Sequence, residues 1–350
     1  MSHRKYFWNF KAAVAVLLWL AISFPALSEA ASRPKPTTKT NSSATNLFVR
    51  SIHGTDFTFK RDPAVKLFLN KSAVRQGILA QDCTVILNTI SLRLPAGSSI
   101  TFYSNGNISE CVPLQDTKFP VKKNEIVCSG GEKVSFYENG LIQSGQLARE
   151  QMLVLGGKNF FFRSGESIGF YETGELQFGY PVSDVRQKLA GNDMLFMAGK
   201  PLAFQKDGRV RSGFLKDLTP IKVGGNIFQV DGYQEITFYK NGAVESLAPD
   251  SITKVLTGKT KMMLAARGTV SFFQNGKIRS CDLEETLPFH AGKQELILLN
   301  DTVTFYNNGN LESGRLSELA EFPVREGIRR VPENMKATFD RSGNLVKTEE

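Results

Sequence analysis

The stretch from Phe136 to Gly145 reads FYENGLIQSG, and close variants of it recur along the chain. The glycine in the middle of the motif returns every 34 residues, with one interval of 33. Self-similarity at a fixed period marks a repeat architecture. We call this residue the turn glycine and number each unit from it. The turn glycines are Gly106, Gly140, Gly174, Gly208, Gly242, Gly276, Gly309 and Gly343.

Apolar residues around the turn glycine follow the two-residue period of β-strands. Positions −6, −4 and +2 are aliphatic or aromatic in almost every unit, and position −4 is phenylalanine from Phe68 to Phe339. Alternation of this kind predicts strands that are buried on one face. Asn-Gly, Asp-Gly and related pairs between the strands supply the backbone of a type I′ turn. Each motif therefore predicts one β-hairpin.

The rest of each unit predicts a second hairpin. Apolar residues recur at +13 and +15 and again at +20 and +22, with a glycine-bearing turn such as Gly156-Gly157 between them. Short hairpins bury no face alone, so neighbouring units must stack. We expect an all-β chain of tandem 34-residue repeats, two β-hairpins each, stacked as an extended twisted antiparallel sheet. A closed β-propeller with four strands per blade is the alternative.

The motif resembles MORN-type repeats, and most closely their bacterial variant. The similarity covers about ten residues of each unit, and Phe136–Gly145 and Phe305–Gly314 are the best copies. The departures are the 34-residue period, longer than that of MORN units, and a second hairpin without the motif. The resemblance implies a β-hairpin array with a scaffolding or binding role, and it transfers no individual site residue.

The N-terminus has the layout of a secretory signal peptide. Arg4, Lys5 and Lys11 precede an apolar run over residues 12–24, and small residues follow at Ser28 and Ala30. That run is shorter than the roughly 18–20 residues of a membrane span. We expect a signal peptide over 1–30, a Pro/Ser/Thr-rich linker over 31–47, and a single β-repeat domain over 48–350. The mature chain is then periplasmic or secreted and does not span a membrane.

Charge and composition argue against several functions. Removing residues 1–30 leaves 40 basic and 33 acidic residues, a net charge of +7 without a block of like charges, so nucleic acid is not an expected partner. The three histidines, His3, His53 and His290, are scattered, and no cysteine pair has zinc-ligand spacing. We therefore expect neither a metal site nor a cofactor.

One column of aromatic residues is the best candidate for ligand binding. Position −3 is out of phase with the buried phenylalanine column, which predicts that it lies on the opposite face of the sheet. Aromatic side chains with polar rims suit glycans or extended peptides, and the same ladder would serve as a second packing layer. The column consists of Tyr103, Tyr137, Tyr171, Tyr239, Phe273 and Tyr306, and Gln205 interrupts it.

Cysteines and hydroxyl residues offer weaker signals. Cys83, Cys111 and Cys128 are close enough in the repeat for one disulfide among them, whereas Cys281 lies five units from Cys111 and should not pair with it. A serine recurs at +4 in several units, which indicates packing rather than an activated nucleophile.

No catalytic constellation emerges from the sequence. The sequence thus favours a non-catalytic exported binding or scaffolding module, with a protein or a cell-envelope glycan as partner. The alternative is a propeller-type exported hydrolase or lyase with a site in a central channel. The oligomeric state is left open.

Overall fold

The computed structural model describes residues 47–61, 65–67, 73–122, 124–257, 260–324 and 327–350. The predicted signal peptide, and the predicted linker up to residue 46, lie outside the described residues, as does Phe68. The described part is all-β, with 36 strands and no helix. It therefore has no helix long and apolar enough to cross a membrane. The predicted all-β repeat fold is confirmed.

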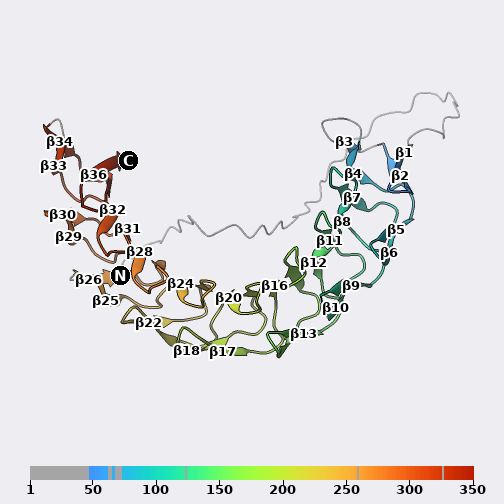
Figure 1. Cartoon of the computed structure of the whole chain (residues 1–350), viewed down its shortest axis with the longest axis horizontal. Coiled ribbons are helices and arrows are strands. Elements are labelled where there is room, and N and C mark those ends of the chain that lie inside the picture. The colour runs from blue at the N-terminus through green and yellow to red at the C-terminus, as the bar shows by residue number, and fades with distance from the viewer. Residues whose placement is uncertain (1–46, 62–64, 68–72, 123, 258–259, 325–326) are drawn as a thin grey trace, which may run out of the picture. The chain divides into compact units, whose positions relative to one another are not determined.

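Eighteen strands, two from the first hairpin of each unit, form one long antiparallel sheet (Figure 1). In spatial order they are β3 (Lys66–Leu67), β4 (Val74–Ile78), β7 (Ser99–Phe102), β8 (Ile108–Cys111), β11 (Val134–Phe136), β12 (Ile142–Gln146), β15 (Ser167–Phe170), β16 (Leu176–Gly179), β19 (Leu202–Phe204), β20 (Val210–Gly213), β23 (Ile236–Phe238), β24 (Val244–Leu247), β27 (Val270–Phe272), β28 (Ile278–Asp282), β31 (Thr302–Phe305), β32 (Leu311–Arg315), β35 (Lys336–Phe339) and β36 (Leu345–Glu349).

The second hairpins do not join this sheet but form separate two-stranded sheets beside it. They are β1 (Leu47–Ile52) with β2 (Thr55–Lys60), β5 (Cys83–Leu87) with β6 (Ile90–Leu94), β9 (Thr117–Val121) with β10 (Asn124–Cys128), β13 (Gln151–Leu155) with β14 (Lys158–Phe162), β17 (Val185–Leu189) with β18 (Asn192–Phe196), β21 (Thr219–Val223) with β22 (Asn226–Val230), β25 (Thr253–Thr257) with β26 (Thr260–Leu264), β29 (Leu287–Ala291) with β30 (Gln294–Leu298), and β33 (Ala320–Val324) with β34 (Gly327–Val331).

The long sheet is open. Each of its hairpins pairs with the hairpins before and after it in the chain, as β12 does with β15 and β16 with β19. Within the described residues, β3 pairs with β4 alone and β36 with β35 alone, so the two ends do not meet. The alternative of a closed propeller is therefore wrong, and the central channel that the enzyme alternative required is not formed.

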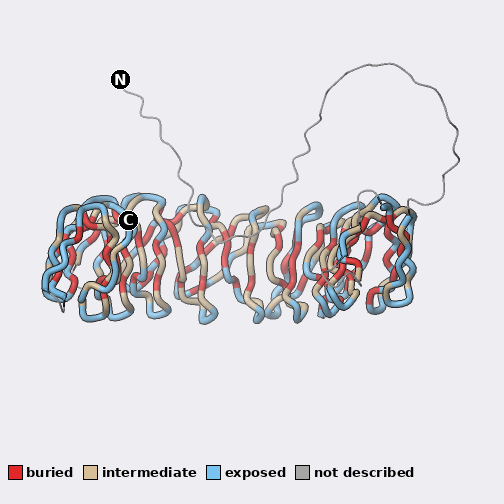
Figure 2. The backbone as a smooth tube through the Cα atoms, turned by 90° about the horizontal axis from the view of Figure 1, so that it is seen from above, coloured by how far each residue is buried: buried red, intermediate tan, exposed pale blue. Residues whose placement is uncertain are grey.

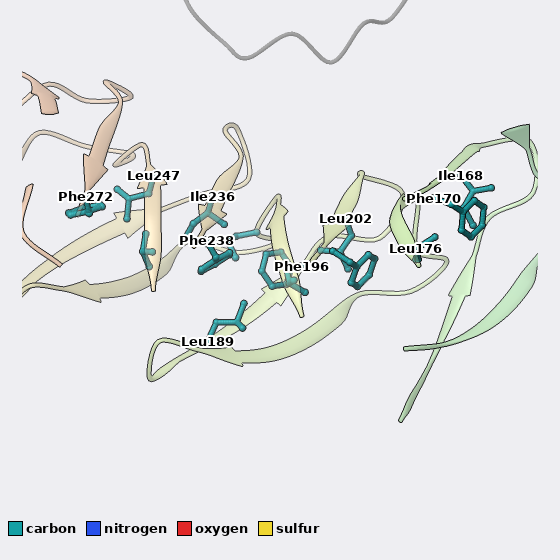
Figure 3. Close-up of a cluster of buried hydrophobic side chains, with 14 of the residues drawn as sticks. Ile168, Phe170, Leu176, Leu189, Phe196, Leu202, Ile236, Phe238, Leu247 and Phe272 are labelled. Carbon is teal, nitrogen blue, oxygen red and sulfur yellow. The ribbon is translucent and has the colours of Figure 1, made fainter. Parts of the chain in front are cut away.

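The hydrophobic core lies between the long sheet and the layer of second hairpins. The apolar columns of both hairpins are buried, and Figure 3 shows Ile168, Phe170, Leu176 and Leu202 among them. Figure 2 shows buried segments within the strands and exposed residues at the turns. Phe204 packs edge-on against Phe160 and Phe162, with ring centroids 5.4 and 6.3 Å apart. Such aromatic pairs stabilise by about 0.5–1.5 kcal/mol beyond their buried area.

Glycine at position +5 makes room for this packing in several units. A β-carbon added to Gly179 would lie 2.6 Å from the ring of Phe162, and one added to Gly213 would lie 2.7 Å from Phe196. The large residue is in each case at +22 of the preceding unit. The recurring Ser-Gly of the motif is thus explained in part, because its glycine receives a side chain from the other layer.

The second hairpin of each unit also contacts the first hairpin two units later. The Asn88 amide donates to the Gly140 carbonyl at 3.2 Å, and Lys122 forms an ion pair with Glu175. The same turns meet at Gly224 and Gly276, where an added β-carbon would lie 2.1 Å from the facing carbonyl oxygen. Each unit is therefore tied to its second neighbour as well as to its first.

The turn geometry differs from the sequence prediction. Asn105 does not have a positive φ, whereas Gly106 does, at 89°. Tyr103 accepts a hydrogen bond from the Gly106 amide and donates its own amide to the Asn107 carbonyl. These bonds define a three-residue loop, a type I turn followed by a left-handed glycine. The predicted type I′ turn in this hairpin is wrong, and paired positive φ values occur instead in second hairpins, as at Gly156 and Gly157.

Candidate functional site

The predicted aromatic column is a hydrogen-bonded ladder between units. The hydroxyl of Tyr137 donates to the carbonyl of Phe170 at 2.8 Å, a residue of the buried phenylalanine column in the next unit. The other tyrosines of the column do the same. Their acceptors are Phe136 for Tyr103, Phe204 for Tyr171, Phe272 for Tyr239 and Phe339 for Tyr306.

Gln205 does not break this ladder. Its side-chain amide donates to the Phe238 carbonyl at 3.3 Å, the acceptor that a tyrosine at this position would use. Phe273 is the member of the column without a donor. All six aromatic residues of the column are half-buried. The hydroxyls of the five tyrosines bond neighbouring units to each other, and a ligand-binding role for the six rings stays a prediction.

Burial raises the pKa of tyrosine hydroxyls in the ladder. It raises the pKa of the Tyr137 hydroxyl above its ordinary value, with a further rise from the carboxylate of Glu172. The pKa of Tyr103 is raised in the same way, by burial first and then by Glu138. Both hydroxyls therefore stay protonated, and able to donate, over the neutral pH range.

The cysteines lie in or against the core. Cys111, Cys128 and Cys281 are buried, Cys83 is half-buried, and all four thiols are free in this structure. Burial raises the pKa of Cys111, Cys128 and Cys281 to about 12, and the neighbouring Cys83 thiol adds to the rise at Cys111. Thiols held neutral in this way react slowly. A disulfide among Cys83, Cys111 and Cys128 stays a prediction.

The histidines, cysteines and carboxylates of the described residues form no metal-binding cluster. Among the described residues, no three histidines, cysteines or carboxylates lie close enough to hold a metal ion. His53 contacts the Asn105 carbonyl at a turn, and His290 is exposed on β29.

A line of small hydroxyl residues crosses the long sheet on the face turned away from the second hairpins, which we call the outer face. Positions −5 and +4 stand opposite each other in the hairpins that carry a turn glycine, and +4 faces −5 of the next unit. We call the resulting row of partners the hydroxyl line. From β20 to β35 it runs through Ser212, Thr237, Ser246, Ser271, Ser280, Thr304, Ser313 and Thr338.

Within a hairpin these hydroxyls bond to each other. Thr237 and Ser246 lie 2.7 Å apart, and Ser271 and Ser280 lie 2.6 Å apart. Ser212 differs, because its partner across the hairpin is Ala203. The residue as a whole is 8% exposed, and its hydroxyl makes no hydrogen bond to the described residues. Every enclosed polar side-chain atom in the described part has a partner, so this hydroxyl is open to solvent.

Aromatic residues replace the small ones in two consecutive units. Phe178 takes position +4, and Tyr180 and Phe214 take position +6. A β-carbon added to Gly169 would lie 2.2 Å from the Phe178 ring, so this ring lies across the backbone of β15. By strand alternation Tyr180 and Phe214 share the outer face with it. All three are half-exposed, and the Nζ of Lys200 lies 5.8 Å from the centre of the Phe214 ring.

We call Phe178, Tyr180 and Phe214 the aromatic patch. It adjoins Ser212, which lies two residues before Phe214 on the same face. The sequence prediction missed this patch, because it followed what the units share. The sequence did contain a signal for this patch, because Phe178 departs from the pattern of its column. From Glu110 to Ser313 the other units carry serine or glutamate at +4.

The outer face is hollowed at its N-terminal end. A cleft of about 560 Å³ opens beside Tyr103, and Gln76, Thr101 and Ser109 line it. Gln76 and Thr101 belong to the same cross-strand row as the hydroxyl line. Lys66 and Arg75 add positive charge here. Of the predicted binding residues, Tyr103 is therefore the one that borders a cleft of this size.

No family model and no curated protein matches this chain. Two solved structures show a faint likeness. Alternansucrase in complex with isomaltononaose is 11% identical with a TM-score of 0.15, over 87% of this chain and 17% of that chain. Choline binding protein F from Streptococcus pneumoniae, with a peptidoglycan analogue, is 12% identical with a TM-score of 0.13, over 87% of this chain and all of that chain. Such scores carry no argument about function.

Proposed function

We propose that this protein is an exported, non-catalytic binding module whose outer sheet face holds an extended partner. The fold supports a module that presents a repeated surface, as stacked repeats do. The apolar run and the small residues before Ala30 support export. The resemblance to MORN-type repeats agrees with such a role.

The observation that carries the proposal is the aromatic patch. Outward positions at +4 and +6 are small or polar in most units, yet three of these positions are aromatic in two adjacent units. They are half-exposed and face no second layer of the fold. Departures from local rules concentrate at functional sites. Clustered aromatic side chains beside polar groups suit ligand recognition.

Cosedimentation of residues 31–350 with insoluble polymers tests the proposal. The panel is peptidoglycan sacculi, chitin, cellulose and intact bacterial cells. We expect at least one to retain the protein, and the triple variant Phe178→Ala, Tyr180→Ala, Phe214→Ala to lose that retention.

Phe161→Ala is the matched control, because Phe161 is 46% exposed but belongs to the second-hairpin layer. Its retention should equal that of the unmodified protein. The single variant Tyr180→Ser serves where the triple variant loses its far-ultraviolet β signal. The proposal fails if no polymer retains the protein, or if the patch variants are retained in full.

A further inference from the structure

Resting on the proposed function, we infer that the partner is an uncharged, unbranched glycan chain that lies along the hydroxyl line and stacks a sugar ring on Phe178. Three features of the outer face lead to this ligand class: its hydroxyls, its aromatic patch and the lack of charged residues in the cross-strand row from Ser135 to Thr338. The glycan would run across the strands, along the length of the long sheet.

The hydroxyl line offers hydrogen bonds at a regular spacing. Paired residues on adjacent antiparallel strands lie about 4.5–5.5 Å apart, close to the length of one pyranose unit in an extended chain. Each hydroxyl has one donor and two acceptor sites. A bonded pair such as Thr237 and Ser246 uses one donor and one acceptor, so each pair keeps a donor and acceptors for a ligand.

Ser212 is the most informative member of the line. It keeps its full hydrogen-bonding capacity, because Ala203 beside it has no hydroxyl and Thr237 on its other side is bonded to Ser246. Its hydroxyl is open to solvent although the residue as a whole is 8% exposed, so only water can satisfy it in the free protein. A ligand hydroxyl placed there would take the place of that water and make a direct hydrogen bond.

The aromatic patch supplies the apolar contact. The ring of Phe178 lies across Gly169, within the same cross-strand row as Ala203 and Ser212. A pyranose ring presents apolar C–H groups on its faces and hydroxyls around its rim. It therefore matches an aromatic ring whose row continues, beyond Gly169 and Ala203, into hydroxyl side chains. Tyr180 follows directly after the same strand.

Two other classes of ligand, polyanions and extended peptides, fit this surface less well. The row is uncharged at every position from Ser135 to Thr338, and its charged members stand beyond these, at Lys66, Glu110 and Lys347. Polyanions such as nucleic acids or uronates need basic side chains along their path. Extended peptides add to a sheet edge through their backbone, whereas this surface is a sheet face.

Isothermal titration with soluble oligosaccharides tests the inference. We expect cellohexaose or chitohexaose to bind more tightly than the corresponding disaccharides, and polygalacturonate not to bind. Phe178→Ala should weaken hexasaccharide binding by about tenfold, the effect of losing one aromatic contact. Ser212→Ala should weaken it as well, whereas Phe161→Ala should leave it unchanged.

The outcomes separate this inference from the proposed function. Retention on sacculi or cells with no affinity for any neutral oligosaccharide would overturn the glycan inference and leave the binding module standing. Affinity that Ser212→Ala and Phe178→Ala do not alter would place the sugar elsewhere and overturn it too. If neither polymers nor oligosaccharides bind, both fail.

Discussion

Gly179 shows that the absence of one atom, the β-carbon, allows the two layers to pack against each other. Its φ is not positive, so the backbone itself would accept a side chain. What excludes one is the Phe162 ring, 2.6 Å from the place of a β-carbon. Two units with a smaller residue at +22 carry a larger one at +5: Leu264 is followed by Cys281 and Val230 by Leu247. The side chains at +5 of one unit and at +22 of the unit before it therefore compete for the same space between the layers.

Gly179→Ala should destabilise the protein. Restricting the unfolded chain would contribute about 0.4–1 kcal/mol of stability, but overpacking against Phe162 costs about 1–3 kcal/mol, so the loss prevails. The measurement is the midpoint of urea unfolding. The control is the double variant with Phe162→Val, which should recover part of the loss, because Val230 at +22 goes with Leu247 at +5. A single variant as stable as the unmodified protein would contradict the shared-volume explanation.

The ladder tyrosines predict a loss of stability at alkaline pH. Burial raises the folded-state pKa of Tyr137 above its unfolded value of about 10. Its contribution to stability is therefore full below about pH 10 and is lost as the pH rises through the folded-state pKa. Urea unfolding across this range should show a shallower decline for Tyr137→Phe than for the unmodified protein. Equal slopes would show that Tyr137 does not titrate in this way.

Hairpins in the long sheet are joined by backbone pairing and by the ladder. Tyr137→Phe removes the bond to the Phe170 carbonyl, and we expect a loss of about 0.5–1.5 kcal/mol. Phe273→Tyr is the matched reverse change, since it would supply a donor toward the carbonyl of Phe305. It should raise stability by a similar amount. If neither change moves the unfolding midpoint, the ladder does not hold the hairpins together.

Hairpins and their number could be predicted from the sequence because buried columns and turn glycines repeat locally. The assignment of hairpins to layers could not, because both kinds show the same alternation. The turn type was missed for a related reason. Asn-Gly suits a type I′ turn, but Asn105 instead accepts the Asn107 amide through its side chain, which favours the three-residue loop.

The candidate site was only partly predictable. Tyr103 was predicted from its column, and it does border a cleft. Phe178 and Ser212 could not be recognised, because their importance depends on cross-strand register: Ser212 has a free hydroxyl only because Ala203 stands opposite. Register between units is a property of the assembled sheet, and a column read along one strand does not contain it.

At the scale of the whole molecule, contacts between second neighbours govern how the stack is built. In the second hairpins of the numbered units, position +20 is apolar in every hairpin but the last. This residue packs on the first hairpin two units later, as Phe228 does on Phe272. In β34 this position is Arg329, which is exposed. Within the described residues no first hairpin packs on this position, and the sequence carries a charged residue there.

Removal of one whole unit should therefore leave a folded protein. Deleting residues 243–276 joins Gly242 to Lys277, two neighbours with the same unit positions as Gly276 and Lys277 in the intact chain. Every remaining hairpin keeps partners at one and two units. We expect a soluble all-β protein by circular dichroism, with a urea m-value lowered in proportion to the lost surface.

Deleting only residues 243–259, half of one unit, is the control. It places a second-hairpin sequence where the long sheet requires a first hairpin, so the phenylalanine column loses its register and the turn contacts between second neighbours fail. We expect this variant to be insoluble or to lack a cooperative unfolding transition. A half-unit deletion that unfolds as cooperatively as the whole-unit deletion would show that the two hairpins are interchangeable, and the two-layer arrangement would then have no basis in the sequence.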